Sequence, residues 1–346
     1  MRIIFITGSY PPDTCGVGDY TYRLAQALQA CGVTIDIVSQ EKWSVENSLN
    51  IVRRLNGYRA DIVHIQYPTV GYGFGLAPQA VSLLYGCVVT LHEVSQTHIL
   101  RRLALYPFTV RSKHVIFTSS HEQHYALQWA PWLKNRSSII PIGSNIVGAN
   151  VEEKGGGNEI VYFGLIRPNK GLEDVVQLAS LIKDNCKPFS IRIIGKPHPD
   201  SMEYYNRLRL RTKTLPVLWC VGSTDDETTD LLSHAKIAYV PYPDGVSERR
   251  GSLLALLANG NAVITTRGAQ TPPALGDVVS FVQSPREALA LAEKIFTDEE
   301  LRKQYLAKGR AYAANFEWSR IASRHVEIYN SLIPLNNSQR SLHMNK

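Results

Sequence analysis

Short apolar runs alternate with amphipathic segments along the first half of the chain. Residues 2–7 form one such run, a loop with two prolines ends it, and residues 19–30 then carry apolar side chains at helical spacing. Cys31-Gly32 follows this helix as a glycine C-cap would. Later apolar runs predict further strands, at residues 33–38, 62–65, 88–91, 115–118 and 139–142.

A polar, glycine-rich stretch at residues 149–159 interrupts the alternation and predicts an exposed linker. Helical spacing later covers residues 287–315, and strand-like runs resume at residues 160–163, 190–194, 217–221, 237–240 and 262–265. Strands that alternate with helices predict parallel sheets covered on both faces, which bind ligands beyond the carboxyl ends of their strands. We therefore expect an α/β chain whose parts are residues 1–150, residues 159–316, a helical segment at 317–335 and a frayed tail at 336–346.

The chain length agrees with two globular domains, because 346 residues exceed the roughly 250–300 residues at which a single hydrophobic core stops growing. No apolar run reaches the ~18–20 residues of a membrane helix, and the run at the N-terminus is shorter than the ~7–15 residues of a signal-peptide core. The five cysteines form no Cys-x-x-Cys pair, so we interpret them as reduced core residues of a cytoplasmic protein. A net charge of +7 fits a solvated basic surface, and equally attraction to a polyanion, an anionic membrane or a phosphate-bearing ligand.

The loop after the first predicted strand carries Gly8, Gly16 and Gly18 and opens a helix. Glycines let a backbone approach a ligand closely, and a helix N-terminus offers free N–H groups to a phosphate, although a plain strand-to-helix turn has the same appearance. A dinucleotide-binding loop would place G-x-G-x-x-G directly after the strand. Here Gly16 and Gly18 lie eight and ten residues beyond Gly8, so we do not favour that alternative.

Two loops of the second half place cations beside helices. Arg167 and Lys170 precede a predicted helix and suit a diphosphate, unless they are simply solvated. Ser247 is the expected N-cap of a buried helix whose first turn holds Arg249 and Arg250. Adjacent arginines at the positive end of a helix favour a bound anion, and a surface turn is the alternative.

His92 follows the predicted strand at residues 88–91, where a polar side chain of a parallel sheet meets the ligand. It could donate to a phosphate or to a sugar hydroxyl, or it could be structural, and His64 is a weaker candidate of the same kind. The sequence has no Asp-x-Asp at a strand end and no Cys/His ligand set, so we expect neither a metal nor another cofactor. The cations would then stabilise a negatively charged leaving group.

At these residues the sequence resembles the retaining GT-B glycosyltransferases of glycosyltransferase family 4, over nearly the whole chain. Each matching piece is short, and their order and spacing together make the resemblance specific. The pieces are Pro11-Pro12, Gly16-Val17-Gly18, Thr90-Leu91-His92, Ile140-Pro141-Ile142-Gly143, Gly164, Lys170-Gly171, Tyr239-Val240-Pro241, Ala258-Asn259-Gly260, Trp318 and Tyr329.

The resemblance implies two Rossmann-like domains that face each other across a cleft, with a C-terminal helix that crosses back onto the first domain. It implies that the second domain binds the nucleotide of the donor and that the sugar keeps its anomeric configuration. His92 would lie beside the transferred sugar and would serve catalysis with Arg167 and Lys170. The donor-binding residues that it implies are Gly16, Val17, Gly18, Arg167, Lys170, Gly195, Ser247, Glu248, Arg249, Arg250, Gly251, Ser252 and Leu253.

The sequence also departs from the family. Members usually carry two glutamates eight positions apart, and those places hold Ser247 and Ala255 here. The usual ribose-binding carboxylate is therefore missing, with Glu248 one position away as a candidate substitute. Leu165 stands where an arginine is common, so Arg167 would serve instead.

We expect a metal-independent retaining hexosyltransferase of polysaccharide biosynthesis that moves glucose from UDP-glucose to a saccharide or lipid-linked hydroxyl. The choice of glucose and UDP rests on frequency within the family. Residues 99–113 mix basic and apolar side chains, which fits an ordinary amphipathic helix as well as peripheral contact with the inner face of a membrane. The alternatives are a non-catalytic nucleotide-sugar binder or partner subunit, and a GT-B enzyme of another type such as a nucleotide-sugar epimerase. No motif supports nucleic-acid binding.

Overall fold

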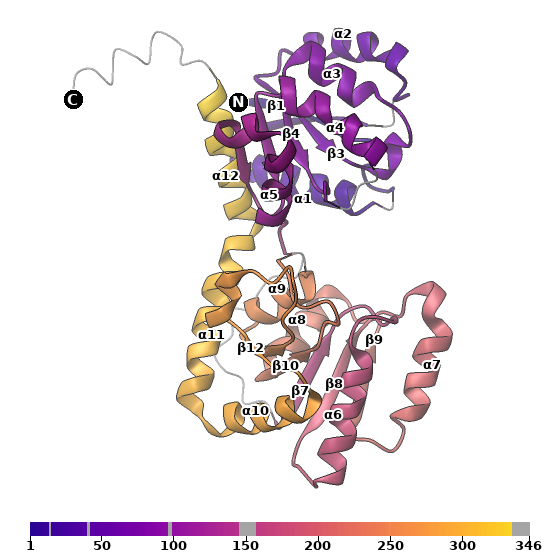
Figure 1. Cartoon of the computed structure of the whole chain (residues 1–346), viewed down its shortest axis with the longest axis vertical. Helices are drawn as coiled ribbons and strands as arrows, with labels where there is room; N and C mark the ends of the chain where they lie inside the picture. Colours follow the sequence, from indigo (N-terminus) through magenta and orange to yellow (C-terminus); the bar gives the residue numbers. More distant parts are fainter. Residues whose placement is uncertain (14, 40–41, 96–98, 145–156, 249, 334–346) are drawn as a thin grey trace, which may run out of the picture. The chain divides into compact units, whose positions relative to one another are not determined.

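The computed structural model describes residues 1–13, 15–39, 42–95, 99–144, 157–248 and 250–333. The chain divides into two compact units: unit 1 contains residues 1–143 and 318–346, and unit 2 contains residues 144–317 (Figure 1). Each unit has a six-stranded parallel sheet with helices around it, which confirms the predicted fold class. Most of the predicted linker, and the whole predicted tail, lie outside the described residues.

The strands of unit 1 lie in the order β2-β1-β3-β4-β5-β6. Successive residues of a strand face opposite sides of the sheet, so Ile4 and Ile6 pack in one core with α2, α3 and α4, whereas Ile3 and Phe5 pack in another with α1 and α12. The C-terminal helix α12 therefore completes unit 1, where it lies along α1 (Figure 1). The elements are β1 (Arg2–Ile6), α1 (Gly16–Ala30), β2 (Thr34–Val38), α2 (Ser48–Tyr58), β3 (Ile62–Tyr67), α3 (Ala77–Tyr85), β4 (Val88–Leu91), α4 (Ile99–Arg111), β5 (His114–Phe117), α5 (Ser120–Trp129), β6 (Ser137–Ile139) and α12 (Trp318–Leu332).

The strands of unit 2 lie in the order β12-β11-β10-β7-β8-β9. Numbered within the unit and counted from the β9 edge, this is the order 3-2-1-4-5-6 of a Rossmann fold. A single hydrophobic core joins the sheet to its helices. The elements are β7 (Glu159–Phe163), α6 (Leu172–Asp184), β8 (Ser190–Gly195), α7 (Met202–Arg211), β9 (Val217–Val221), α8 (Asp225–His234), β10 (Ile237–Val240), α9 (Gly251–Ala258), β11 (Ala262–Thr265), β12 (Ser280–Phe281), α10 (Pro285–Thr297) and α11 (Glu299–Ala313).

Three local predictions were wrong. The helix expected at residues 287–315 is two helices, because Asp298 ends α10 and caps α11 by accepting a 2.9 Å hydrogen bond from the Leu301 N–H. The helix expected to open at Ser247 begins at Gly251, because the loop before it is held elsewhere: the Val246 N–H donates to a carbonyl beyond β11 at 3.0 Å. The last strand of unit 1 lies at Ser137–Ile139, not at residues 139–142.

The cysteines also differ from expectation. All five are free thiols, and Cys15 and Cys87 are buried as predicted. Cys31 and Cys186 are exposed instead, because Cys31 caps the C-terminus of α1 and Cys186 lies in the turn that follows α6. The description of the cysteines as core residues therefore holds for only part of the set.

Candidate functional site

The sheet of unit 2 reverses its strand order between β7 and β10, and ligands of such sheets bind at the point of reversal. The loops that follow these two strands are in contact there, because Gly171 packs against Pro241 with no room for a side chain. A Cβ atom added to Gly171 would lie only 1.8 Å from the carbonyl oxygen of Pro241. The loop after β8 joins them, because a Cβ on Gly195 would lie 1.9 Å from the carbonyl oxygen of Gly164. These three loops form one closely packed rim at the carboxyl edge of the sheet.

Three cations gather at this rim. Burial lowers the pKa of Lys170, and the charges of Arg250 and Arg167 lower it further. The Arg250 guanidinium lies 4.7 Å from the ring centroid of Tyr242 and pairs with Asp244. Its Nε is buried without a hydrogen-bond partner among the described residues. A partly desolvated lysine beside two arginines, with Asp244 offsetting only part of the charge, favours a bound anion.

The N-terminus of α9 lies beside these cations. A Cβ on Gly251 would meet no atom within 4 Å, so the backbone there faces open space. The hydroxyl groups of Ser252 and Tyr242 are hydrogen-bonded at 2.7 Å, which fixes the first turn to the loop after β10. Leu253 is fully buried and anchors the helix in the core. The exposed first turn of a helix offers N–H groups to an anion.

The segment just before α9 holds the remaining candidates of unit 2. Ser247 and Glu248 are half-buried in the loop. Burial raises the pKa of the Glu248 carboxyl, which lies beside the hydroxyl of Tyr312 in α11. Arg249 lies outside the described residues. The structure therefore groups Arg167, Lys170 and Arg250 around one rim and places Glu248 against α11.

The contact at Gly171 gives a test of the rim by protein stability. Gly171→Ala should lower the free energy of unfolding by roughly 3 kcal/mol or more, because a left-handed backbone (φ +78°) costs about 1–2 kcal/mol for alanine and overpacking against Pro241 costs about 1–3. Gly222→Ala is the matched control. The φ of Gly222, +81°, is similar to that of Gly171, but a Cβ atom added to Gly222 would meet nothing within 4 Å. Urea unfolding followed by circular dichroism measures both variants. Equal losses would contradict the close packing of these loops.

In unit 1 the strand order reverses between β1 and β3, and the glycine-containing loop lies there. The Gly8 N–H donates to the hydroxyl of Thr69, beyond β3, at 2.9 Å. Gly16 opens α1, and a Cβ on it would meet nothing within 4 Å, whereas a Cβ on Gly18 would lie 2.9 Å from the backbone of the loop. Val17 is half-buried between them. An open Gly16 at a helix N-terminus suits close approach by a ligand.

His92 directly follows β4 and is buried. The ring of Tyr20, from α1, meets it edge to face with 4.7 Å between the ring centroids. The Nε2 atom of His92 and the amide oxygen of Gln66 lie 2.9 Å apart. Because an amide oxygen carries no proton, Nε2 is the donor, and a neutral His92 then has Nδ1 as its acceptor. Gln66 thus determines the tautomer of His92.

A buried polar chain continues from Gln66 to the C-terminal helix. The Gln66 amide nitrogen lies 3.4 Å from Nε2 of His64, which also bonds the Thr90 hydroxyl at 2.7 Å. Nδ1 of His64 bonds the Tyr329 hydroxyl of α12 at 2.6 Å. Burial holds the pKa of His64 well below its usual value, so the imidazole is neutral. This network was not predicted from the sequence, although polar His64 and Gln66 lie two positions apart in an otherwise apolar strand.

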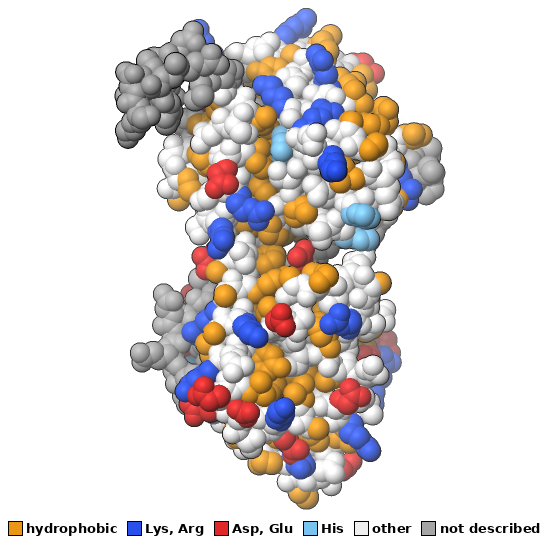
Figure 2. Space-filling model, turned by 60° about the vertical axis from the view of Figure 1, so that its left-hand side comes forward, with side chains coloured by type: hydrophobic (Ala, Val, Ile, Leu, Met, Phe, Trp, Pro, Cys, Tyr) orange, Lys and Arg blue, Asp and Glu red, His pale blue; other side chains and the backbone are white. Residues whose placement is uncertain are grey.

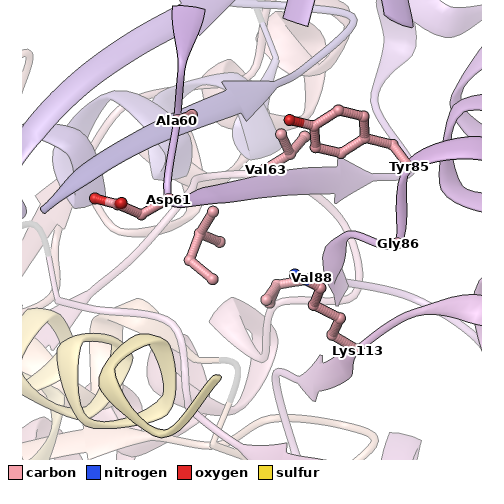
Figure 3. Close-up of a pocket in the computed structure, with 8 residues that line it drawn as sticks. Ala60, Asp61, Val63, Tyr85, Gly86, Val88 and Lys113 are labelled. Atoms are coloured by element: carbon pink, nitrogen blue, oxygen red, sulfur yellow. The ribbon is translucent and has the colours of Figure 1, made fainter. Parts of the chain in front are cut away.

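The described residues also line cavities that the sequence did not predict, and two of them are relevant here. One cavity, of about 760 Å³, lies at the carboxyl end of β9, where Trp219 and Asp226 are among its lining residues. Gly222, which also lines it, donates its N–H to the carbonyl oxygen of Gly195 at 3.2 Å, so this cavity adjoins the loop after β8. The other, of about 240 Å³, lies at the opposite end of the unit 1 sheet, where Asp61 and Lys113 border it (Figure 3). Of these two cavities, the first borders the rim, so it is a candidate for the rest of a nucleotide.

Within the described ranges, no group of three His, Cys, Asp or Glu side chains is placed to hold a metal ion. No helix of these ranges is long and apolar enough to cross a membrane.

Comparisons with known proteins identify the fold. No protein-family model matches the sequence, and a comparison with curated proteins finds no match. Solved structures do match. A glycosyltransferase from Rickettsia africae is 17% identical with a TM-score of 0.74, over 97% of this chain and 99% of that one. The Anabaena protein HepE, in complex with UDP and glucose, is 14% identical with a TM-score of 0.67, over 96% and 100%.

WaaG, a glycosyltransferase involved in lipopolysaccharide biosynthesis, is 16% identical with a TM-score of 0.60, over 94% of this chain and 99% of that one. These identities are low, so the likeness concerns the fold. It extends over nearly the full length of each chain and includes both units. The chain therefore has the GT-B fold of these glycosyltransferases.

Proposed function

We propose that the chain is a cytoplasmic glycosyltransferase of family 4 that moves glucose from UDP-glucose to a saccharide or lipid-linked hydroxyl, with retention and without a metal. The observation that carries the proposal is the convergence of Lys170, Arg167 and Arg250 at the point of strand reversal in unit 2. Such a site suits the diphosphate of a nucleotide sugar. The UDP and UDP-glucose complexes of HepE, which has the same fold, support the choice of donor.

The residues present suit departure of a nucleoside diphosphate. As the glycosidic bond breaks, negative charge grows on the phosphate oxygen, and Arg167, Lys170 and Arg250 would stabilise it. The open N–H groups at Gly251 would add donors from the α9 terminus. His92 would accept a hydrogen bond from a sugar hydroxyl through Nδ1, since Nε2 is committed to Gln66. These cations supply the stabilisation that a metal ion supplies in other transferases.

One observation favours the alternative, a non-catalytic nucleotide-sugar binder. Ala255, at one of the usual glutamate positions, is fully buried within α9. Glu248, the candidate substitute, lies beside Tyr312. A protein that kept the phosphate site and lost the ribose carboxylate could bind a donor without turning it over.

A panel of nucleotide sugars, supplied with EDTA and without acceptor, separates these alternatives. We expect slow release of nucleoside diphosphate from one donor, UDP-glucose, because water replaces the missing acceptor. Release that depends on added Mg²⁺ would refute the metal-independent mechanism. Donor binding by calorimetry without release, even when saccharide acceptors are added, would favour the binder.

Lys170 gives the proposal a pH dependence. Its pKa is lowered, so it loses its charge below the range where an ordinary lysine does, and UDP affinity should fall as pH rises through that pKa. Calorimetric titration of UDP from neutral to alkaline pH measures the decline. Lys170→Arg should remove this decline, because arginine stays charged throughout. A decline that persists unchanged in Lys170→Arg would show that another group is responsible.

A further inference from the structure

The loop after β3 carries the two most exposed large apolar side chains among the described residues. Phe74 is 97% exposed and Val70 is 76% exposed. Apolar side chains reach the surface over both units (Figure 2), so exposure alone does not identify a site. The conformation and the position of this loop distinguish Phe74 from the other exposed apolar residues.

Phe74 lies at the tip of a tight turn. The Gly75 N–H donates to the Tyr72 carbonyl at 2.8 Å, which closes a turn of four residues. Gly73 has φ +52° and ψ −122°, the conformation of the first central residue of a type II′ turn, where glycine is favoured. Phe74 is the second central residue. The backbone of the turn therefore presents the Phe74 ring to solvent.

Both ends of this turn are anchored in unit 1. Tyr72, before the tip, is buried, and its hydroxyl donates to the Ile6 carbonyl of β1 at 3.1 Å. Gly75, after the tip, packs against Trp43, since a Cβ atom added to Gly75 would lie 2.2 Å from the Trp43 carbonyl oxygen. These contacts hold the turn in one place. A side chain that is positioned in advance loses little conformational freedom when a ligand binds to it.

The turn belongs to the ligand-binding edge of unit 1. The strand order β1-β3-β4 places the loop after β3 between the glycine-containing loop after β1 and His92 after β4. The Gly71 N–H donates to the Ser9 hydroxyl at 2.8 Å, and a Cβ atom added to Gly71 would lie 1.7 Å from the Gly8 carbonyl oxygen. The two loops are therefore packed together, and Phe74 lies at the same edge of the sheet as His92.

The exposure of Phe74 suits a sugar ring better than a hydrocarbon chain. A hydrocarbon chain is stabilised by enclosure on several sides, because the gain scales with the apolar area removed from water, whereas Phe74 offers one flat, open face. A sugar ring has a C–H face that can stack on the electron-rich face of an aromatic ring. The neighbouring loop offers the Tyr10 hydroxyl and the exposed Asp13 carboxylate, which suit the hydroxyls of a sugar.

We propose that the Phe74 ring is the platform on which a saccharide acceptor stacks at the carboxyl edge of unit 1, an inference that rests on the proposed transferase function. The reacting hydroxyl then belongs to a sugar ring and not to an alkyl or prenyl alcohol. Phe74 binds the acceptor through its ring face and takes no part in the departure of the diphosphate. It determines which acceptors bind.

Saturation-transfer difference NMR with the intact chain tests the proposal, in the presence and in the absence of UDP. The probes are maltose, cellobiose, lactose and chitobiose, with hexanol as the hydrocarbon probe. We expect a disaccharide to receive saturation on the C–H protons of one ring face and to bind more tightly than hexanol. Phe74→Leu should lower the disaccharide affinity about tenfold, because it keeps an apolar side chain and loses the ring. Phe74→Tyr should keep the affinity within about twofold.

The matched control is Tyr106→Leu, because Tyr106 is an aromatic residue of unit 1 that is 50% exposed and lies in the second half of α4, which leads to the amino end of β5. This variant should leave disaccharide affinity unchanged. An equal loss with Tyr106→Leu, undiminished disaccharide binding by Phe74→Leu, tighter binding of hexanol, or no disaccharide binding by wild type would overturn the proposal. Thermal unfolding verifies that each variant is folded. Because these measurements need no cleavage of a donor, acceptor stacking and the proposed transfer can fail separately.

Discussion

Replacement of Lys170 by alanine is expected to weaken UDP binding by about 100-fold. The lysine is half-buried beside two arginines, so its bond to a phosphate would form in a partly desolvated place, and charge-assisted hydrogen bonds contribute about 1.5–3 kcal/mol. Arg167 is exposed, and its replacement should cost about tenfold in affinity. Calorimetric titration of UDP measures both losses. Lys183→Ala, an exposed lysine near the end of α6, is the control and should have no effect.

Asp244 provides a further variant for the same calorimetric titration of UDP. It pairs with Arg250 and competes with a phosphate for that guanidinium. Asp244→Asn should therefore preserve UDP affinity or raise it a few-fold, whereas a metal-binding role for this carboxylate would predict a loss. If Lys170→Ala and Lys183→Ala bound UDP equally well, the rim would not be the phosphate site.

Replacement of His92 by alanine is expected to lower kcat for UDP-glucose by about 100-fold with little change in UDP affinity, because a preorganised group that acts in the transition state is worth about that much. Gln66→Leu should lower kcat by about tenfold, since it frees the tautomer that the 2.9 Å bond now fixes. Gln66→Glu keeps an acceptor at the same place and should restore part of the rate. Steady-state kinetics measure these effects.

Nitrogen-15 NMR of labelled histidine distinguishes this positioning role from a loss of fold. Wild type should show a proton on Nε2 of His92, and Gln66→Leu should show a mixture of tautomers. Ser138→Ala, which removes a hydrogen bond of His114 elsewhere in unit 1, should change neither the His92 signal nor kcat. An unchanged tautomer together with an unchanged kcat in Gln66→Leu would show that Gln66 does not position His92.

Much of the fold could be predicted because parallel strands are buried on both faces and appear in the sequence as continuous apolar runs. The runs at Ile3–Ile6 and Ala262–Thr265 are of this kind. The position of strand β6 was predicted wrongly because Ser137–Ile139 is only half-buried and so does not appear as a continuous apolar run. The start of α9 could not be predicted, because a contact across the sheet, not the capping preference of Ser247, determines it.

The candidate site divides in the same way. Lys170 and His92 could be selected from the sequence, since each follows a strand and the topology carries such residues to the carboxyl edge. The long-range contacts around the site could not be predicted from the sequence. Tyr329 is 265 positions from His64, and no local pattern links a C-terminal helix to the third strand. The stacking of Arg250 on Tyr242 likewise depends on how the loop folds back.

We propose that the chain cleaves a UDP-sugar at the rim of unit 2. The most direct test is proton NMR of UDP-glucose incubated with the intact chain in EDTA, with Lys170→Ala beside it. We expect UDP and glucose to appear together, the α-anomer of glucose to appear first, and Lys170→Ala to abolish both signals. The absence of UDP release from UDP-glucose or any other nucleotide sugar, with saccharide acceptors present, would contradict the assignment as a transferase.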